Sequence, residues 1–264
     1  SMWRLFHVLV GEPDNMDVIL AAPYDIPDRV FLPGYRYRPG DASSMAAYHR
    51  RLLGLQILSA VLFALCAVGS LALYRAAAPW QRAALVALNG ILLAVCLALG
   101  KGLPNSKNYS EGAALAVAFG SFVDAGPRAG LLLCDASYTT GIGFQQLLAD
   151  YPALREKRIL YLDGIEATGR PVVLHHPEDL AQAKKLAAAI GPDAVTEAVA
   201  QASAIAGLPG TLMVCVGVDD GQGRVYLPHV RTTGDCAFDL EQMERIKKGV
   251  SAYLEGIAGV PAGR

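Results

Sequence analysis

The sequence predicts an α/β protein in which a mostly parallel, mixed sheet is flanked by helices and interrupted by an inserted transmembrane hairpin of two helices. Short apolar runs alternate with helical segments along most of the 264 residues, which is typical of a parallel sheet with helices on both faces. Two longer apolar segments follow each other closely in the first half of the chain. They hold almost no charge, although 18% of all residues are charged.

The two long apolar segments cover about 55–74 and 83–100. A helix of about 20 apolar residues crosses a hydrocarbon core of about 30 Å. The short connection holds Trp80 between Arg75 and Arg82, and Tyr74 precedes it, as expected for aromatic residues at a membrane surface. We therefore expect an integral membrane protein with two transmembrane helices. The alternative is a helical hairpin buried in a soluble core.

This hairpin divides the chain into two predicted parts. Residues 51–100 form the hairpin, and residues 1–50 together with 101–264 form one discontinuous α/β domain, because two antiparallel spans return the chain to the same side. Positive charges near the membrane are more numerous on the domain side (Arg50, Arg51, Lys101 and Lys107) than in the connection. By the positive-inside rule the domain is expected to be cytoplasmic.

Charge and cysteine content narrow the classes of function. The net charge is −1, so no basic surface is available to hold a nucleic-acid backbone. The five cysteines form no CxxC pair, which disfavours a zinc knuckle or a redox dithiol. Unpaired thiols fit a reducing compartment, in agreement with a cytoplasmic domain.

The elements of the soluble domain follow from periodicity and turn signals. Strands are expected at 3–10 and 17–22, either as a hairpin or as neighbours, with the second strand buried on both faces. Further strands are expected in AGLLLCDA, RILYLDGIE and VVLHH, and a hairpin in TLMVCVGVDD and GRVYLPHV. The expected helices cover 111–123, 141–150, 178–206 and 239–256.

Three polar motifs have structural explanations that compete with functional ones. His175-His176-Pro177-Glu178-Asp179 could bind a metal ion, but it is more typical of a strand end followed by a helix N-terminus, where acidic residues are favourable. Gly141-Ile142-Gly143 could cradle a phosphate, but lacks the rest of a nucleotide-binding pattern. Asp219-Asp220-Gly221 is typical of a hairpin turn rather than a calcium loop.

Five short stretches are informative through the order in which they follow one another along the chain. They are Pro23-Tyr24-Asp25, Asn108 to Ala114 with Gly112 between, Asp135-Ala136-Ser137-Tyr138, Leu162-Asp163-Gly164, and Arg231-Thr232-Thr233-Gly234-Asp235. In this order they resemble the di-zinc aminopeptidases, the group that includes glutaminyl cyclase and the transferrin-receptor ectodomain. The resemblance covers most of the chain outside the hairpin and implies a zinc-exopeptidase-like fold.

The resemblance also implies where zinc ligands would lie, and most are replaced. Pro23 and Arg231 stand where the family has histidines, and Asn108 stands where it has the bridging aspartate. Ser137 and Tyr138 replace the glutamate pair that supplies the general base and a ligand. Asp163 alone keeps a ligand position, while Asp25 and Asp235 are retained neighbours.

These replacements bear directly on chemistry. Each zinc ion needs three or four N, S or O donors, which Pro23 and Arg231 cannot supply. Without the glutamates no carboxylate takes a proton from a metal-bound water. We therefore expect no metal, no cofactor and no catalytic residue. Asp25 and Asp235 could instead cap turns or helices, and Asp163 could pair with Arg231 or lie solvated in a loop.

The sequence thus favours a catalytically inactive, membrane-anchored aminopeptidase-like protein that acts as an interaction or assembly module of a membrane complex. Its expected partners are the lipid bilayer and other membrane proteins or further copies of itself, with no nucleic acid. One alternative is a membrane-bound metallo-hydrolase whose relocated or single-metal site uses Asp25, Asp163, His175, His176 or His229. Another is a small-molecule binder that uses the vacated cleft between the strand ends at Pro23, Cys134 and Asp163.

Overall fold

The computed structural model describes residues 7–12, 15–26, 29–30, 36–39, 42–101, 107–134, 146, 148–199 and 210–258. Contacts divide the chain into two compact units. One consists of Ser1–Pro27, Arg36–Met45 and Asn105–Arg264, and the other of Asp28–Tyr35 and Ala46–Pro104.

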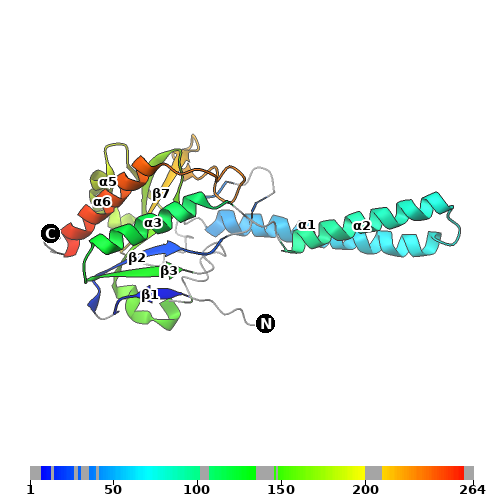
Figure 1. Cartoon of the computed structure of the whole chain (residues 1–264), viewed down its shortest axis with the longest axis horizontal. Helices are drawn as coiled ribbons and strands as arrows, with labels where there is room; N and C mark the ends of the chain where they lie inside the picture. Colours follow the sequence, from blue (N-terminus) through cyan, green and yellow to red (C-terminus); the bar gives the residue numbers. More distant parts are fainter. Residues whose placement is uncertain are drawn as a thin grey trace. The chain divides into compact units, whose positions relative to one another are not determined.

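The larger unit is built on a mixed sheet, which has eight strands among the described residues (Figure 1). The strands are β1 (Val8–Val10), β2 (Val18–Pro23), β3 (Ala129–Cys134), β4 (Arg158–Ile165), β5 (Arg170–His175), β6 (Val195–Ala198), β7 (Thr211–Asp219) and β8 (Val225–Tyr226). Their order is β1-β3-β2-β4-β7-β5-β6, with β8 paired to β7. The central strands β3, β2, β4 and β7 are parallel, while β1 and β5 pair antiparallel to their inner neighbours.

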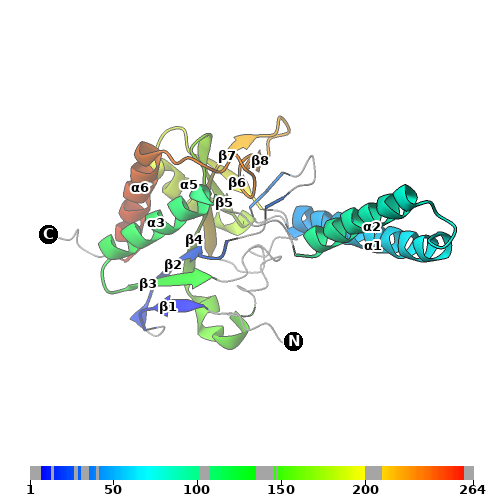
Figure 2. The same ribbon diagram turned by 45° about the vertical axis from the view of Figure 1, so that its right-hand side comes forward.

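Three long helices pack together over the sheet (Figure 2). They are α3 (Tyr109–Asp124), α5 (Leu180–Ile190) and α6 (Leu240–Ala258). The buried face of α6 presents Ile246, Val250 and Leu254, as its periodicity predicts. Two short 3-10 helices, Pro152–Glu156 and Pro177–Asp179, also belong to this unit. The predicted fold class, a mostly parallel mixed sheet flanked by helices, is confirmed.

The first two strands differ from one of the two arrangements we expected. Every residue of β2 is buried, which confirms a strand covered on both faces. A hairpin between β1 and β2 is wrong, because β3 lies between them and pairs with both. The strands that pair with β2 are therefore β3 and β4, which lie more than a hundred positions later in the chain.

The helix expected over 178–206 is also wrong over 191–199, while 200–206 lie outside the described residues. Helix α5 ends at Ile190, and Gly191 follows with φ 151°, a left-handed conformation that a residue with a side chain rarely adopts. Pro192 follows, and the chain then forms β6. Alanine-rich composition favoured a helix, but the Gly-Pro break and the open edge of β5 decide the structure locally. The helix expected over 141–150 and Gly141-Ile142-Gly143 lie mostly or wholly outside the described residues.

Two polar motifs take the structural roles that we favoured for them. His175 ends β5, and the 3-10 helix Pro177–Asp179 leads into α5, so this stretch is a strand end followed by a helix N-terminus. Asp219 ends β7 and the antiparallel β8 begins at Val225, so the intervening residues form a hairpin turn.

The smaller unit consists mainly of two helices, α1 (Ala42–Leu73) and α2 (Pro79–Lys101). Within them, Ala46–Leu73 and Pro79–Gly100 are long and apolar enough to cross a membrane, and only 6% and 0% of their most apolar windows are buried. A hairpin buried in a soluble core is therefore wrong for this chain.

Two polar contacts join the helices of this hairpin to each other. Gln56 donates to the carbonyl oxygen of Leu99 at 2.7 Å, and Asn89 donates to the hydroxyl of Ser70 at the same distance. Where the surroundings are apolar, such hydrogen bonds fix the register of paired helices. At the connection, the guanidinium of Arg82 lies 5.2 Å from the ring centre of Tyr74.

Candidate functional site

Four carboxyl groups form a cluster in the larger unit, and we treat this carboxyl cluster as the candidate functional site. Asp25 follows β2, Asp163 lies near the end of β4, Glu111 lies in the first turn of α3, and Asp235 lies in the segment before α6. Because β2 and β4 are parallel neighbours, their carboxyl ends meet at one edge of the sheet. The negative charges of these groups raise one another's pKa. Asp163 and Asp235 raise the pKa of Glu111, and Asp25 raises the pKa of Asp163.

Asp163 lies at the centre of the cluster and is only 4% exposed. The hydroxyl of Tyr37, from the segment 36–39, donates to its Oδ2 at 2.7 Å. Glu111, itself 2% exposed, lies close enough to Asp163 for the two charges to act on each other. Two buried negative charges side by side repel each other strongly, so their proximity favours the protonated form of one of the two groups.

The environments of the two groups indicate where this proton resides. Burial raises the pKa of Glu111 well above its ordinary value, and the negative charge of Asp163 raises it further. Burial also raises the pKa of Asp163, to about 6, but the hydrogen bonds from Tyr37 and Glu111 oppose this rise. Of the two groups, Glu111 is thus the one whose neutral form is favoured more strongly.

Asp235 has a different task. Its Oδ1 accepts the backbone N–H of Ser110 at 2.8 Å, and its Oδ2 accepts the hydroxyl of Ser110 at 2.7 Å. Ser110 lies in the first turn of α3, whose backbone N–H groups have no partner within the helix. Asp235 thus caps α3 from outside, the role that we considered for it. Burial raises its pKa, although the bonds from Ser110 lower it.

The other predicted site residues lie as follows. Pro23 ends β2 opposite Cys134 of β3, and burial with the nearby Asp25 raises the pKa of the Cys134 thiol. Asn108 precedes α3 in the N-cap position, but its side chain makes no capping hydrogen bond. Arg231 is 4% exposed and has φ 63°.

One expectation about the site stays untested, and another gains no support from the structure. Ser137 and Tyr138 lie outside the described residues. The partners found for Asp163 in the described part of the chain are Tyr37 and Glu111, so its expected pairing with Arg231 gains no support there.

Two members of the site were missed by sequence reasoning. Glu111 lies in a helix whose buried side is otherwise formed by alanine, valine and serine, and Tyr37 lies outside all the strands and helices that the sequence predicts. The available signal for Glu111 was its position: it is a carboxylate in the first turn of a helix with an otherwise apolar buried face. No comparable signal marks Tyr37, because its contact with Asp163 joins residues 126 positions apart.

A di-zinc centre does not fit these side chains. Zinc needs deprotonated ligands, whereas burial raises the pKa of both Glu111 and Asp163, and Oδ2 of Asp163 already accepts the hydroxyl of Tyr37. Within the ranges that the structure describes, no three His, Cys, Asp or Glu side chains are grouped as a metal ion requires. Pro23 offers no donor, and Arg231 brings a positive charge.

A histidine–glutamate pair lies in the segment that leads to Asp235. Glu166 accepts the backbone N–H groups of His229 and Val230 at 2.7 and 2.9 Å, and its Oε2 lies 3.1 Å from Nδ1 of His229. The carboxylate is buried, while the side chain of His229 is 43% exposed. Burial raises the pKa of Glu166, and its bonds to His229 and Val230 lower it. The arrangement holds one histidine ring at the surface in a fixed orientation.

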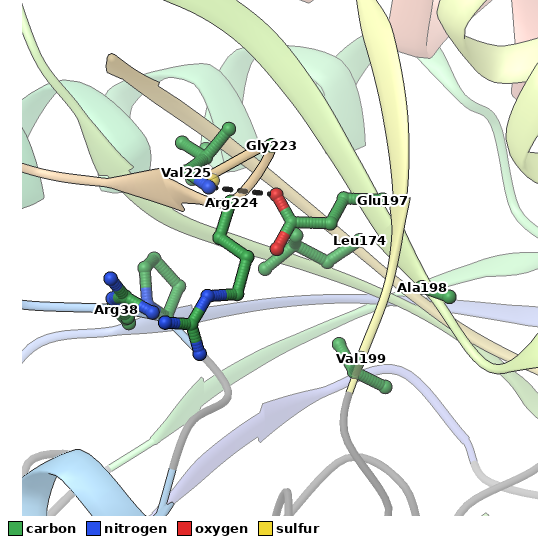
Figure 3. Close-up of a pocket in the computed structure, with 10 residues that line it drawn as sticks. Arg38, Leu174, Glu197, Ala198, Val199, Gly223, Arg224 and Val225 are labelled. Atoms are coloured by element: carbon green, nitrogen blue, oxygen red, sulfur yellow. Dashed lines mark hydrogen bonds between the residues drawn. The ribbon is translucent and has the colours of Figure 1, made fainter. Parts of the chain in front are cut away.

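A cavity of about 290 Å³ lies among the residues that Figure 3 labels. Its charged side chains are bonded to neighbours: Arg38 pairs with Asp220, and Glu197 accepts the backbone N–H of Val225 at 2.9 Å. Arg224 lies 3.7 Å from Asp220. These bonds fasten β8 and the segment 36–39 to the edge of the sheet, which accounts for the charges without a ligand.

Comparisons with known proteins give limited similarity. No protein-family profile matches the chain, and no curated protein matches it. Two solved structures of LapA from Legionella pneumophila, one of them described as an aminopeptidase, match with 12% identity and a TM-score of 0.45. Each match covers 96% of this chain, which spans 56% and 55% of the length of the two neighbours.

Proposed function

We propose that the chain is a membrane-anchored, aminopeptidase-like protein without hydrolase activity, which serves as an interaction or assembly module of a membrane complex. The carboxyl cluster carries this proposal. Asp163, which keeps a ligand position of the resembling family, accepts the hydroxyl of Tyr37 and lies beside the buried Glu111. Burial and the charge of Asp163 raise the pKa of Glu111, so the arrangement favours a bound proton over a metal ion and a metal-bound water.

The hairpin supports the membrane part of the proposal. Its large apolar side chains are exposed on α1 and α2, and a soluble surface with so many of them would aggregate. In a bilayer these side chains contact lipid, while the bonds Gln56–Leu99 and Asn89–Ser70 are shielded between the helices. The charges listed above favour a cytoplasmic domain.

A measurement of metal content tests the inactive site. The full chain, purified in mild detergent and equilibrated with zinc, is desalted and its zinc content and turnover of aminopeptidase substrates are measured. We expect substoichiometric zinc, no turnover, and no change in Asp163→Asn. The matched control is Asp193→Asn, because Asp193 pairs with Arg245 on the surface. Stoichiometric zinc that is lost in Asp163→Asn but not in Asp193→Asn would refute the proposal.

The assembly role needs its own experiment. The tagged full chain is recovered from detergent-solubilised membranes beside a variant in which the sequence of 55–74 is shuffled at constant composition. We expect the same membrane proteins to accompany the wild type and Asp163→Asn in fixed proportion, and to be reduced with the shuffled hairpin. Recovery of the chain alone in all three would contradict an assembly role.

One observation favours a second candidate function, a hydrolase with a relocated site. The ring of His229 is oriented by the buried Glu166 and half exposed, as a general base would be. Under this alternative, hydrolysis of esters or peptides by the full chain would be abolished in His229→Ala and kept in His176→Ala. Binding of a small molecule in the vacated cleft stays a further alternative, and ligand density between Asp25 and Asp163 would favour it.

A further inference from the structure

The cavity in Figure 3 is lined by apolar side chains and by charged side chains of both signs. Its volume of about 290 Å³ approaches the range of small-molecule sites, about 300–1,000 Å³. The described residues that line it include no member of the carboxyl cluster. The bonds described above account for the presence of its charges, but they do not use all the hydrogen-bonding capacity of Arg38, Arg224 and Glu197. The cavity is therefore a second candidate site.

One side of the cavity has an excess of positive charge. Arg38 and Arg224 both pair with Oδ2 of Asp220, whose side chain is only 1% exposed. Oδ1 of Asp220 accepts the backbone N–H groups of Gln222 and Arg224 at 2.8 and 3.2 Å, so both carboxylate oxygens are occupied. One carboxylate thus serves two guanidinium groups. Each guanidinium has five N–H donors, more than its bonds to Asp220 and Gln222 use, so donors remain for an acceptor in the cavity.

The negative charge of the cavity belongs to Glu197 of β6. Its Oε2 accepts the backbone N–H of Val225 at 2.9 Å, the one hydrogen bond found for this side chain in the described part of the chain. In Figure 3 its carboxylate points towards the side of the cavity on which Arg224 lies. Burial raises the pKa of Glu197, and the bond from Val225 and the charge of Arg38 oppose this rise without cancelling it. One carboxyl oxygen therefore remains for a donor in the cavity.

The two sides of the cavity are complementary to a molecule that carries both signs of charge. Two guanidinium groups share one carboxylate on the first side, which leaves one positive charge in excess, and Glu197 supplies one negative charge on the other. An anion alone would pair with the guanidinium groups and leave Glu197 without a partner, and a cation alone would do the reverse. A molecule with a protonated amine and a carboxylate pairs with both sides.

We propose that this cavity binds a small zwitterion, a molecule with a protonated amine and a carboxylate on an apolar body. The amine donates to the remaining carboxyl oxygen of Glu197, and the carboxylate accepts from Arg38 and Arg224. The apolar body contacts Leu174 and Val199, which belong to the lining. This inference goes beyond the proposed assembly role, because it rests on other residues and either one can fail while the other holds.

The first test compares ligands by isothermal titration of the full chain in mild detergent, with the heat of titrating protein-free detergent subtracted. The probes are two zwitterions that differ in the separation of their charges, L-leucine and 6-aminohexanoate. Hexanoate and hexylamine are the matched controls, because each keeps only one of the two charges. We expect at least one zwitterion to bind roughly tenfold or more tightly than both controls, the scale of a hydrogen bond to a charged group. Absence of binding by both zwitterions, or equally tight binding of a control, would overturn the proposal.

Two variants test which side chains bind the zwitterion. Glu197→Gln removes the negative charge and keeps an acceptor for Val225, while Arg224→Gln removes a guanidinium from a side chain that is 55% exposed, so the thermal transition should not change. We expect each to weaken binding by roughly tenfold or more. Arg170→Gln is the matched control, because Arg170 pairs with Asp219 outside the cavity lining. Binding that neither cavity variant weakens, or that Arg170→Gln weakens equally, would overturn the proposal.

Discussion

Strand β2 and helix α1 are almost equally apolar, yet their side chains meet opposite environments. Every residue of β2 is buried, while Leu65, Val68 and Leu71 of α1 are 65–79% exposed. The difference lies in length and in neighbours: β2 has six residues and a strand on each side, whereas α1 has 32 residues and pairs with one helix. Apolar content alone therefore does not separate the two segments, and their length decides which of them could cross a bilayer.

Truncating one leucine in each region gives the largest expected contrast. Leu20→Ala in β2 removes a fully buried side chain and should lower the free energy of unfolding by about 2–5 kcal/mol. Leu65→Ala in α1 removes an exposed side chain and should leave the unfolding of the domain unchanged. Chemical denaturation in detergent measures both. Equal losses in the two variants would mean that the hairpin is packed like the sheet.

The carboxyl pair sharpens the comparison, because the sheet region buries carboxyl groups, whereas α1 and α2 contain none. Since the pKa of Glu111 is raised above its ordinary value of 4.5, the folded protein holds a proton that the unfolded chain releases. Stability should therefore fall as pH rises above about 4.5, and Asp163 adds to this fall between 3.8 and about 6. Glu111→Gln keeps a hydrogen-bond donor without the titrating proton.

We therefore expect Glu111→Gln to raise the melting temperature at pH 8 and to change it little at pH 4.5. Each kcal/mol recovered corresponds to roughly 2–4 °C in a domain of this size. Glu241→Gln, on the exposed face of α6, is the control and should not alter the pH dependence. A melting temperature of Glu111→Gln below the wild type at pH 8 would show that Glu111 is ionised and stabilising.

A smaller effect is expected at the cap of α3. Asp235→Ala removes the acceptor of both Ser110 hydrogen bonds and should destabilise the domain by about 1 kcal/mol, the usual cost of losing a helix cap. Asp235→Asn keeps one acceptor oxygen and should lose less. Denaturant midpoints measure the difference, and equal losses in the two variants would argue against capping as the main role of Asp235.

The smallest effect concerns the polar contact inside the hairpin. Asn89→Ala removes the bond to Ser70 and should weaken the pairing of α1 and α2 by about 0.6 kcal/mol, the average for such bonds between membrane helices. Double-mutant cycles with Ser70→Ala in lipid measure the coupling. A coupling near zero would mean that packing alone sets the register of the hairpin.

Local patterns in the sequence predicted the elements whose structure depends on local properties. The hairpin, β2, the β7–β8 turn and α6 follow from apolar length, turn residues and periodicity. The pairing of β1 was not accessible in this way, because β3, its partner, is distant in sequence. Likewise, Gly191 ends α5 within a stretch whose composition favours a helix. The residues that follow form β6, which pairs with β5.

The same limit applies to the carboxyl cluster. Asp163 and Asp235 follow from the order of motifs, but the neighbouring carboxyl group of Glu111 and the donor Tyr37 do not. Tyr37 reaches Asp163 across 126 residues, and such contacts leave no periodic trace in a single sequence. The sequence predicts which positions of the resembling family lack zinc donors, and the structure adds that Tyr37 and Glu111 lie beside Asp163.

The most direct test of the inactive site is whether Glu111 carries a proton at neutral pH. A protonated Glu111 and a zinc ion would compete for Asp163. Infrared difference spectra of the full chain against Glu111→Gln, at pH 7 with and without excess zinc, report that proton as the stretching band of a neutral carboxyl group. We expect the band to be present in the wild type, absent in Glu111→Gln and unchanged by zinc. A band that disappears on addition of stoichiometric zinc would show that the carboxyl cluster is a working metal site.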